Sequence, residues 1–252
     1  MKNLKTTILT ALAMLTTNLT SHAQNQMFSI HADYVKPSME KEYISICKEY
    51  AETCKKYNLQ NADFTTVRLD NGTFLTFETV ANIATLDTDT SAPLTDKMGK
   101  EKFQELLVRF NKCYDRHGSY MINRIENLTY MPEGAAAAQE GNNYRKYHYL
   151  YVTPSTAASV GAKIKAIKDL YLKKGSKEYF RVYHSGYGTL GEYFLVVISA
   201  KNEEAYAIQT AENDKLSSTE NEPLMDDLFQ NISRYDPMTG YIKPELSYIT
   251  KK

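Results

Sequence analysis

The chain has 252 residues, of which 42% are hydrophobic and 24% are charged. Lys plus Arg and Asp plus Glu number 30 each, so the formal net charge is zero, and no basic stripe typical of nucleic-acid binders is visible. This composition can supply a sizeable core, and it excludes nucleic acid as the expected partner.

The first 23 residues have the order of a secretory signal peptide. Lys2 and Lys5 precede an apolar, threonine-rich run over residues 6–20, and Ser21-His22-Ala23 supplies the small residues of a cleavage site. The run is shorter than the ~20 residues that a spanning helix needs, and no later stretch is apolar enough to cross a membrane. We therefore expect a periplasmic or secreted mature protein without a membrane span.

Residues 24–131 predict a first unit with the order strand, helix, strand, strand, helix, strand. The assignment depends on alternating and helically spaced apolar residues, and on Asn71-Gly72, a pair that supplies the positive φ angles of a tight hairpin turn. The predicted elements are a strand at 27–35, a helix from Pro37, strands at 62–69 and 73–80, a helix with apolar residues from Phe103 to Cys113, and a strand near 119–130.

Residues 144–252 predict the same order again. Residues 132–143 lie between the two units and contain Pro132-Glu133-Gly134 and four alanines with no apolar period, as is typical of a linker. The predicted elements of the second unit are a strand at 145–152, a helix carrying Val160 to Tyr171, strands at 178–184 and 192–199, a helix around Met225 to Ile232, and a strand near 240–249.

Residue matches between the two units indicate an internal duplication. Tyr34-Val35-Lys36-Pro37-Ser38 returns as residues 151–155, and residues 126–130 return as residues 244–248, with spacings of 117 and 118 residues. Short chance similarities rarely keep their spacing over a whole unit. We predict an α+β protein made of two tandem βαββαβ repeats.

The strand ending in Val35-Lys36-Pro37, followed by a helix, a hairpin, a helix and a closing strand, resembles the dimeric α/β barrel superfamily. That superfamily includes antibiotic-biosynthesis monooxygenases, haem-degrading monooxygenases and NIPSNAP-like proteins. The resemblance implies two ferredoxin-like units that pack sheet against sheet, with the ligand or cofactor between the sheets. In this chain both units would form a pseudo-dimer within one polypeptide, and the resemblance argues fold better than activity.

Two histidines occupy matching positions in the two predicted repeats. His31 and His148 each stand six residues before the proline or its counterpart, Pro37 and Pro154. By period two, His31 and Asp33 share the less apolar face of their strand, so we expect them to point into the lumen between the sheets. They could act as a general acid/base, ligate haem or belong to a metal site, or they could be inherited lumen residues without turnover. No zinc or iron spacing accompanies them, so no metal site is predicted.

Other sequence features suggest binding more than catalysis. Arg68 and Arg181, on the second strand of each unit, could hold a carboxylate or a haem propionate in the lumen, or could lie in water at strand ends.

The G-x-G-x-x-G pattern at residues 186–191 runs into a strand, so we interpret it as a hairpin turn and not as a dinucleotide site. Three cysteines, Cys47, Cys54 and Cys113, are expected to be buried without a disulfide framework.

These observations leave three functional hypotheses and no assigned catalytic residue. The first is an exported module that binds a small, partly aromatic ligand between its sheets. The second is a monooxygenase-type enzyme, either cofactor-free or haem-dependent, and the third is an interaction protein whose lumen is filled by side chains. A cavity of ~300 Å³ or more in the lumen would favour the two ligand hypotheses over the third.

Overall fold

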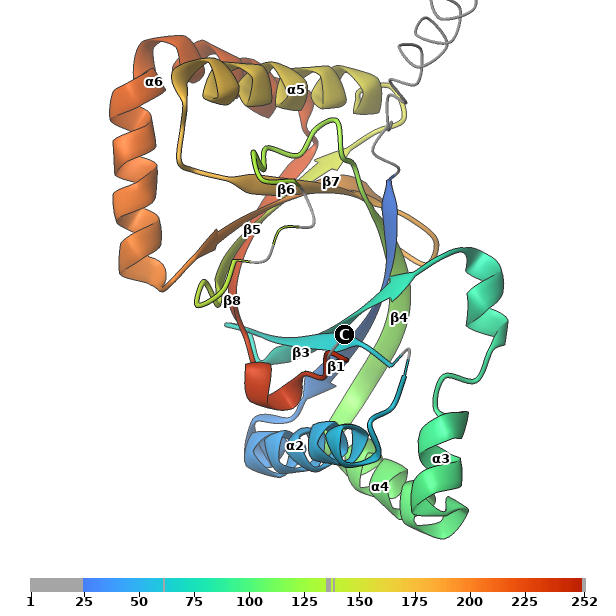
Figure 1. The fold of residues 1–252 in the computed structure, drawn as a ribbon. Coiled ribbons are helices and arrows are strands. Elements are labelled where there is room, and N and C mark those ends of the chain that lie inside the picture. Colours follow the sequence, from blue (N-terminus) through green and yellow to red (C-terminus); the bar gives the residue numbers. More distant parts are fainter. Residues whose placement is uncertain (1–24, 61, 135–136, 138, 251–252) are drawn as a thin grey trace, which may run out of the picture.

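The computed structural model describes residues 25–60, 62–134, 137 and 139–250, and the proposed signal peptide lies outside them. Within the described part, eight strands close into one barrel with five α-helices outside it (Figure 1). The strands are β1 (Gln26–Val35), β2 (Phe64–Leu69), β3 (Thr73–Val80), β4 (Tyr114–Arg124), β5 (Tyr144–Val152), β6 (Phe180–Ser185), β7 (Glu192–Ala200) and β8 (Arg234–Ile242). The helices are α2 (Glu40–Tyr57), α3 (Ala92–Met98), α4 (Lys100–Cys113), α5 (Ala157–Lys174) and α6 (Glu203–Asn231).

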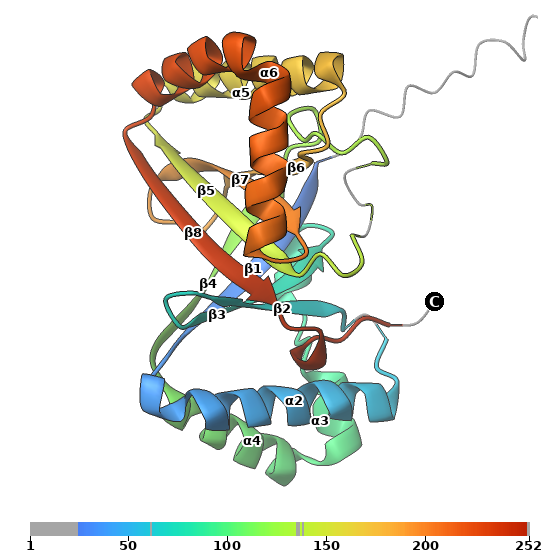
Figure 2. The same ribbon diagram turned by 90° about the vertical axis from the view of Figure 1, so that its left-hand side faces the viewer.

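The strands run around the barrel in the order β1-β3-β2-β8-β5-β7-β6-β4, and all neighbours are antiparallel. Strands β1 to β4 therefore form one half of the barrel and β5 to β8 the other. Helices α2, α3 and α4 cover the first half, and α5 and α6 cover the second, on the opposite side of the barrel (Figure 2). A single chain thus supplies the whole closed sheet.

Two short seams join the halves. Strands β2 and β8 pair over Val67–Leu69, and β4 and β6 pair over Ile122–Arg124. Gly240 lies in the first seam, where a Cβ atom would come within 2.9 Å of the carbonyl oxygen of Arg68. Any other residue would push these two strands apart, so glycine is required for the close approach.

The residues after β4 and β8 cross to the other half in the same way. Tyr130 forms a β-bridge with Phe180, and Tyr248 forms one with Phe64. The hydroxyl of Thr129 accepts a hydrogen bond from the Val182 amide at 3.0 Å. In the other half, the Ser247 hydroxyl accepts one from the Thr66 amide at 2.9 Å. The final strands of both predicted repeats therefore end earlier than expected, because these segments leave the strand to pack across the seam.

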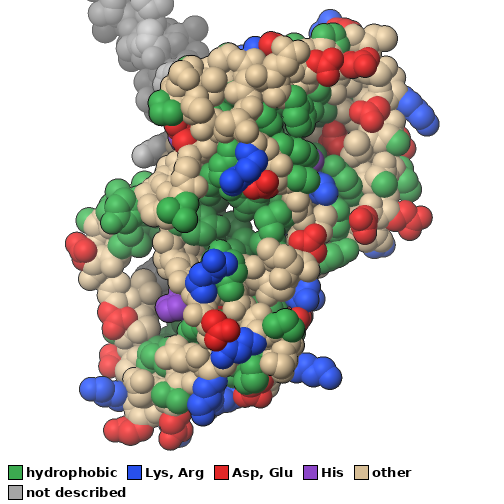
Figure 3. Space-filling model, turned by 180° about the vertical axis from the view of Figure 1, so that it is seen from behind, with side chains coloured by type: hydrophobic (Ala, Val, Ile, Leu, Met, Phe, Trp, Pro, Cys, Tyr) green, Lys and Arg blue, Asp and Glu red, His purple; other side chains and the backbone are tan. Residues whose placement is uncertain are grey.

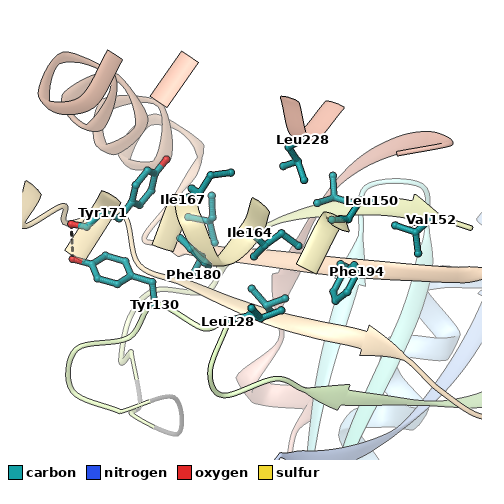
Figure 4. Packing of buried hydrophobic residues seen from close by; sticks show 13 residues of the cluster. Leu128, Tyr130, Leu150, Val152, Ile164, Ile167, Tyr171, Phe180, Phe194 and Leu228 are labelled. Carbon is teal, nitrogen blue, oxygen red and sulfur yellow. Dashed lines mark hydrogen bonds between the residues drawn. The ribbon is translucent and has the colours of Figure 1, made fainter. Parts of the chain in front are cut away.

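The core of the second half lies between the sheet and helices α5 and α6 (Figure 4). Tyr130, from the connection that follows β4, reaches this core and its hydroxyl donates to the main-chain oxygens of Tyr171 at 3.3 Å and Ser176 at 2.8 Å. Apolar residues on α5, including Ile164 and Ile167, pack onto β6 and β7. The connection after β4 is therefore an integral part of the second half's core.

Helix α6 is longer than the sequence predicted. It spans 29 residues and begins after Asn202, whose side chain accepts a hydrogen bond from the Ala205 amide. Its buried residues include Asn213, Ser217 and Asn221, so much of its inner face is polar. An apolar period is visible only near its C-terminal end, which explains why sequence patterning missed the part of the helix before Met225.

Other local predictions agree with the structure. The three cysteines are buried and free. Residues 186–191 form the β6–β7 hairpin connection, as predicted. The β2–β3 turn agrees only in part, because Gly72 has a positive φ of 85° but Asn71 does not; the Asn71 side chain instead accepts a hydrogen bond from the Thr73 amide. Within the described residues, no helix combines the length and apolar character needed to cross a membrane.

Candidate functional site

The barrel lumen is filled across its middle by apolar side chains and is hollow at both ends. The residues of this central layer include Ile30, Val67, Ile122, Tyr147 and Leu195. A cavity of about 450 Å³ opens at the end where β1 and β5 finish, and one of about 630 Å³ opens at the end where they begin. The space-filling view from behind shows a hollow rimmed by hydrophobic side chains between the two halves (Figure 3).

The larger cavity combines aromatic rings with guanidinium groups, and we call it the arginine cavity. Phe28, Phe77 and Tyr183 supply rings from three strands, and Arg145 and Arg181 project from β5 and β6. Lys55 and Glu140 also line it. Its volume lies within the range of ~300–1,000 Å³ that is typical of small-molecule sites.

Hydrogen bonds hold both arginines in place. The Nη1 atom of Arg145 donates to the main-chain oxygens of Asn142 and Tyr144. Arg181 donates to the Gln139 side-chain oxygen at 3.1 Å and to the Ala137 carbonyl at 2.5 Å. Burial lowers the pKa of both guanidinium groups, and the charge of Arg181 lowers the pKa of Arg145 further. Arginine is not deprotonated in proteins, so both groups carry a positive charge.

The cavity at the other end has five tyrosines in its lining, and we call it the tyrosine cavity. The rings are those of Tyr34, Tyr120, Tyr149, Tyr151 and Tyr193. Burial is the main reason that the pKa of Tyr149 lies well above its ordinary value. This phenol is therefore neutral at physiological pH and offers a hydroxyl and a ring face, not a base.

The predicted lumen position of His31 and Asp33 is wrong, because both side chains point to the layer of helix α2. The Tyr43 hydroxyl on α2 donates to Asp33 Oδ2 at 2.6 Å. His31 Nε2 lies 3.2 Å from Asp33 Oδ1, and its Nδ1 lies 2.9 Å from the Ser119 hydroxyl. The hydrogen bond to Asp33 is the main reason that the pKa of His31 is raised. Ile30 and Ala32 take the lumen face because the middle of the lumen is apolar.

His148 also points away from the lumen, contrary to prediction. It lines a cavity of about 270 Å³ between the sheet and helices α5 and α6, and its Nδ1 lies 2.7 Å from the Tyr235 hydroxyl. Burial lowers the pKa of His148 to about 4, so the imidazole is neutral at physiological pH. His31 and His148 do occupy matching strand positions, but they face different helix layers.

Of the two arginines predicted to line the lumen, one lies on the helix side of the sheet and the other lies in the lumen. Arg68 faces helix α2 and forms a two-pronged ion pair with Glu40, with Nε–Oε1 and Nη2–Oε2 distances of 2.6 and 3.0 Å. Its prediction as a lumen residue is therefore wrong. Arg181 lines the lumen as predicted.

The structure does not place His31 and His148 to bind one haem. The barrel wall and lumen separate them, so no single porphyrin could contact both. The cavity at His148 is below the ~300 Å³ at which sites for drug-sized molecules begin. We derive no haem chemistry from these residues.

Arg145 is the site residue that sequence reasoning missed. A signal was present, because Arg145, Tyr147, Tyr149 and Tyr151 alternate along β5 and so share one face. Three aromatic rings in period two indicate one environment along the strand, and the arginine at the end of that row belongs to the same face.

Comparisons with known proteins identify the fold. The chain is similar in structure to a provisionally assigned monooxygenase from Lactobacillus acidophilus, with a TM-score of 0.55, 11% identity, and coverage of 90% of this chain and 97% of that one. An anthrone oxidase-like protein gives a TM-score of 0.56 at 12% identity, covering 88% and 92%. The fold resembles the dimeric α/β barrel.

A third match to this barrel is a provisionally assigned monooxygenase from Fusobacterium nucleatum, with a TM-score of 0.52, 12% identity, and coverage of 87% and 93%. No family model and no curated protein matches the sequence. At these identities the likeness establishes the fold of this chain and leaves its activity open.

Proposed function

We propose that the protein binds a small, partly aromatic molecule with an anionic group inside its barrel, in the arginine cavity. The observation that carries this proposal is the pairing of two partly buried guanidinium groups with aromatic rings around one cavity of about 630 Å³. A guanidinium group that lines a cavity can bind an anionic ligand through charge-assisted hydrogen bonds. Arg181 is close enough to Arg145 for its charge to lower the pKa of Arg145.

The chemistry of the cavity favours a planar acid as the ligand. Guanidinium groups bind carboxylate, sulfonate or phosphate oxygens through paired, charge-assisted hydrogen bonds. The rings of Phe28, Phe77 and Tyr183 offer apolar and edge contacts to an aromatic ligand. An anion between the two arginines would also relieve their mutual repulsion, which a neutral ligand could not do.

A monooxygenase-type enzyme is the second candidate. Proteins with a similar fold are described as provisional monooxygenases and as anthrone oxidase-like, which supports this alternative for an aromatic substrate. The two end cavities weigh against the third hypothesis, a lumen filled by side chains.

We also propose that the barrel is an internally duplicated pseudo-dimer. The matching sequence segments after β4 and β8 make reciprocal contacts with β6 and β2, which supports this origin. A ligand held in the lumen would then contact both duplicated units, as the arginine cavity does through Phe28 and Arg181.

The binding proposal is tested with two matched fluorescent probes. 8-Anilinonaphthalene-1-sulfonate carries an anionic group, and N-phenyl-1-naphthylamine is its neutral counterpart. We expect Arg145→Met and Arg181→Met each to weaken sulfonate binding by roughly 10-fold or more, because a hydrogen bond to a charged group contributes ~1.5–3 kcal/mol. Binding of the neutral probe should change by less than about twofold.

Arg116→Met is the control variant, because Arg116 lines the tyrosine cavity at the opposite end of the barrel. It should leave both probes unaffected. Equal loss of both probes in the arginine-cavity variants, or unchanged sulfonate binding, would contradict the proposal. Oxygen uptake with a bound aromatic acid would favour the enzyme, and binding without uptake would favour the binding module.

A further inference from the structure

Three potential metal ligands converge on the outer face of β1 and β4. His31 and Asp33 are two residues apart on β1, and His117 pairs directly with Asp33 across the β1–β4 ladder. Because alternate residues of a strand share a face, all three side chains project to the same side of the sheet. One ligand atom from each lies within 4.8 Å of the others.

We propose that His31, Asp33 and His117 form a binding site for a divalent transition-metal ion of the zinc type. Two imidazole nitrogens and one carboxylate oxygen are a ligand set found in zinc sites and in sites for neighbouring first-row metals. Mg²⁺ and Ca²⁺ prefer oxygen ligands alone, so this set disfavours them. Three protein ligands leave at least one coordination position for water or another small ligand.

The atoms around the first two ligands support the site independently of their proximity. In metal sites, the second nitrogen of a ligating histidine and the second oxygen of a ligating carboxylate are usually hydrogen-bonded. Here His31 Nε2 and Asp33 Oδ1 face each other at 3.2 Å, while His31 Nδ1 is held by Ser119 and Asp33 Oδ2 by Tyr43. The atoms that would bind the ion, His31 Nε2 and Asp33 Oδ1, therefore face each other. The remaining nitrogen of His31 and the remaining oxygen of Asp33 each have a hydrogen-bond partner.

The third ligand and the neighbouring cavity give access to the site. His117 is exposed, and its ring centroid lies 5.4 Å from that of His31, so a modest side-chain rotation brings its nitrogen to the ion. A cavity of about 230 Å³, lined by His31, Asp33 and Glu78, adjoins the site under helix α2. An open coordination position there could hold a small oxygen ligand.

This site is separate from the arginine cavity of the proposed function, although His117 also lines the tyrosine cavity. His31 and Asp33 lie on the helix side of β1, whereas the lumen side of the same strand carries Ile30 and Ala32. Failure of one proposal therefore leaves the other intact. The sequence alone did not predict a metal site, because His117 lies far along the chain from the other two ligands.

The test is a titration of the full-length chain, without an affinity tag, with Zn²⁺ and with Co²⁺. We expect one Zn²⁺ per chain by calorimetry, and Co²⁺ should give the visible absorption of a low-coordinate site. His117→Ala should weaken Zn²⁺ binding at least about 10-fold, and since this residue is exposed the fold should be retained. Tyr43→Phe, which removes only the support of Asp33, should weaken binding by roughly 10-fold.

His184→Ala is the matched control, because His184 pairs with Glu192 at 3.1 Å in the other half, and no third ligand is found beside that pair among the described residues. It should bind Zn²⁺ like the unmodified chain. Absence of stoichiometric binding at micromolar Zn²⁺, or equal losses in His117→Ala and His184→Ala, would overturn the proposal.

Discussion

At the scale of single residues, the same side-chain type serves different purposes in the two halves. His31 gains an acidic partner, Asp33, which raises its pKa, whereas His148 contacts the Tyr235 hydroxyl and has a lowered pKa, mainly because it is buried. Their strand positions match, but their surroundings do not. The two histidines at matching positions therefore do not share the same acid-base properties.

The depressed pKa of His148 predicts a loss of stability in acid. The unfolded chain binds a proton near the ordinary pKa of 6.5, while the folded chain resists it until about pH 4. The free energy of unfolding should therefore fall as pH drops from about 6.5 to 4, by up to roughly 3 kcal/mol from this residue. Urea unfolding of the unmodified chain and of His148→Gln at several pH values measures this pH dependence of the free energy of unfolding. Parallel pH profiles would show that His148 does not contribute.

At the scale of elements, the segments after β4 and β8 bind the two halves of the barrel together. Each places a hydroxyl side chain against a buried main-chain amide of the opposite half, through Thr129 and Ser247. The amide of Val182 belongs to a residue with no exposed surface, so water cannot replace a lost partner there. These contacts stabilise the seams beyond the three residue pairs of each strand ladder.

Removal of either hydroxyl should destabilise the fold. Thr129→Val and Ser247→Ala should each lower the free energy of unfolding by about 1–3 kcal/mol, because each leaves a buried amide unsatisfied. Thr88→Val, at an exposed position, is the control and should change stability by less than about 0.5 kcal/mol. Denaturant unfolding measures all three variants. A Thr129→Val variant as stable as the control would mean that the seam amide finds another partner.

At the scale of the whole molecule, the two halves depend on each other for burial of the lumen layer. Ile30 and Val67 from the first half pack with Tyr147 and Leu195 from the second. Separate halves would expose this apolar face and the edges of β2, β4, β6 and β8. The covalent connection keeps the partner face at a high local concentration, so pairing within the chain is favoured.

Cutting that connection should leave a two-piece complex. A protease site introduced between Glu133 and Gly134, both exposed, would separate the units without removing residues. We expect the pieces to co-elute in gel filtration, and the midpoint of thermal unfolding to fall on dilution because refolding becomes bimolecular. An intact chain with an uncleavable sequence at the same place is the control. Two soluble, separate monomers after cleavage would contradict the pseudo-dimer proposal.

Much of the architecture was predictable from sequence because it depends on local periodicity. The hairpin strand at 73–80 matches β3, and the apolar spacing of Tyr43 and Ile46 marks the buried face of α2. The interpretation of residues 186–191 as a turn also followed from local context, since the glycines lead directly into a strand. The resemblance to the dimeric α/β barrel rested on this order of elements, and the fold agrees with it.

The direction of the polar side chains was decided only by tertiary structure. Period two showed that His31 and Asp33 share a face, but not whether that face meets the lumen or the helices. The helix layer accepts them because Tyr43 satisfies Asp33, while the lumen takes the apolar residues of β1. The arginine cavity and the convergence of His117 with His31 likewise depend on pairings between distant strands. Local sequence determined which residues share a face, and packing against partners far along the chain determined what that face contacts.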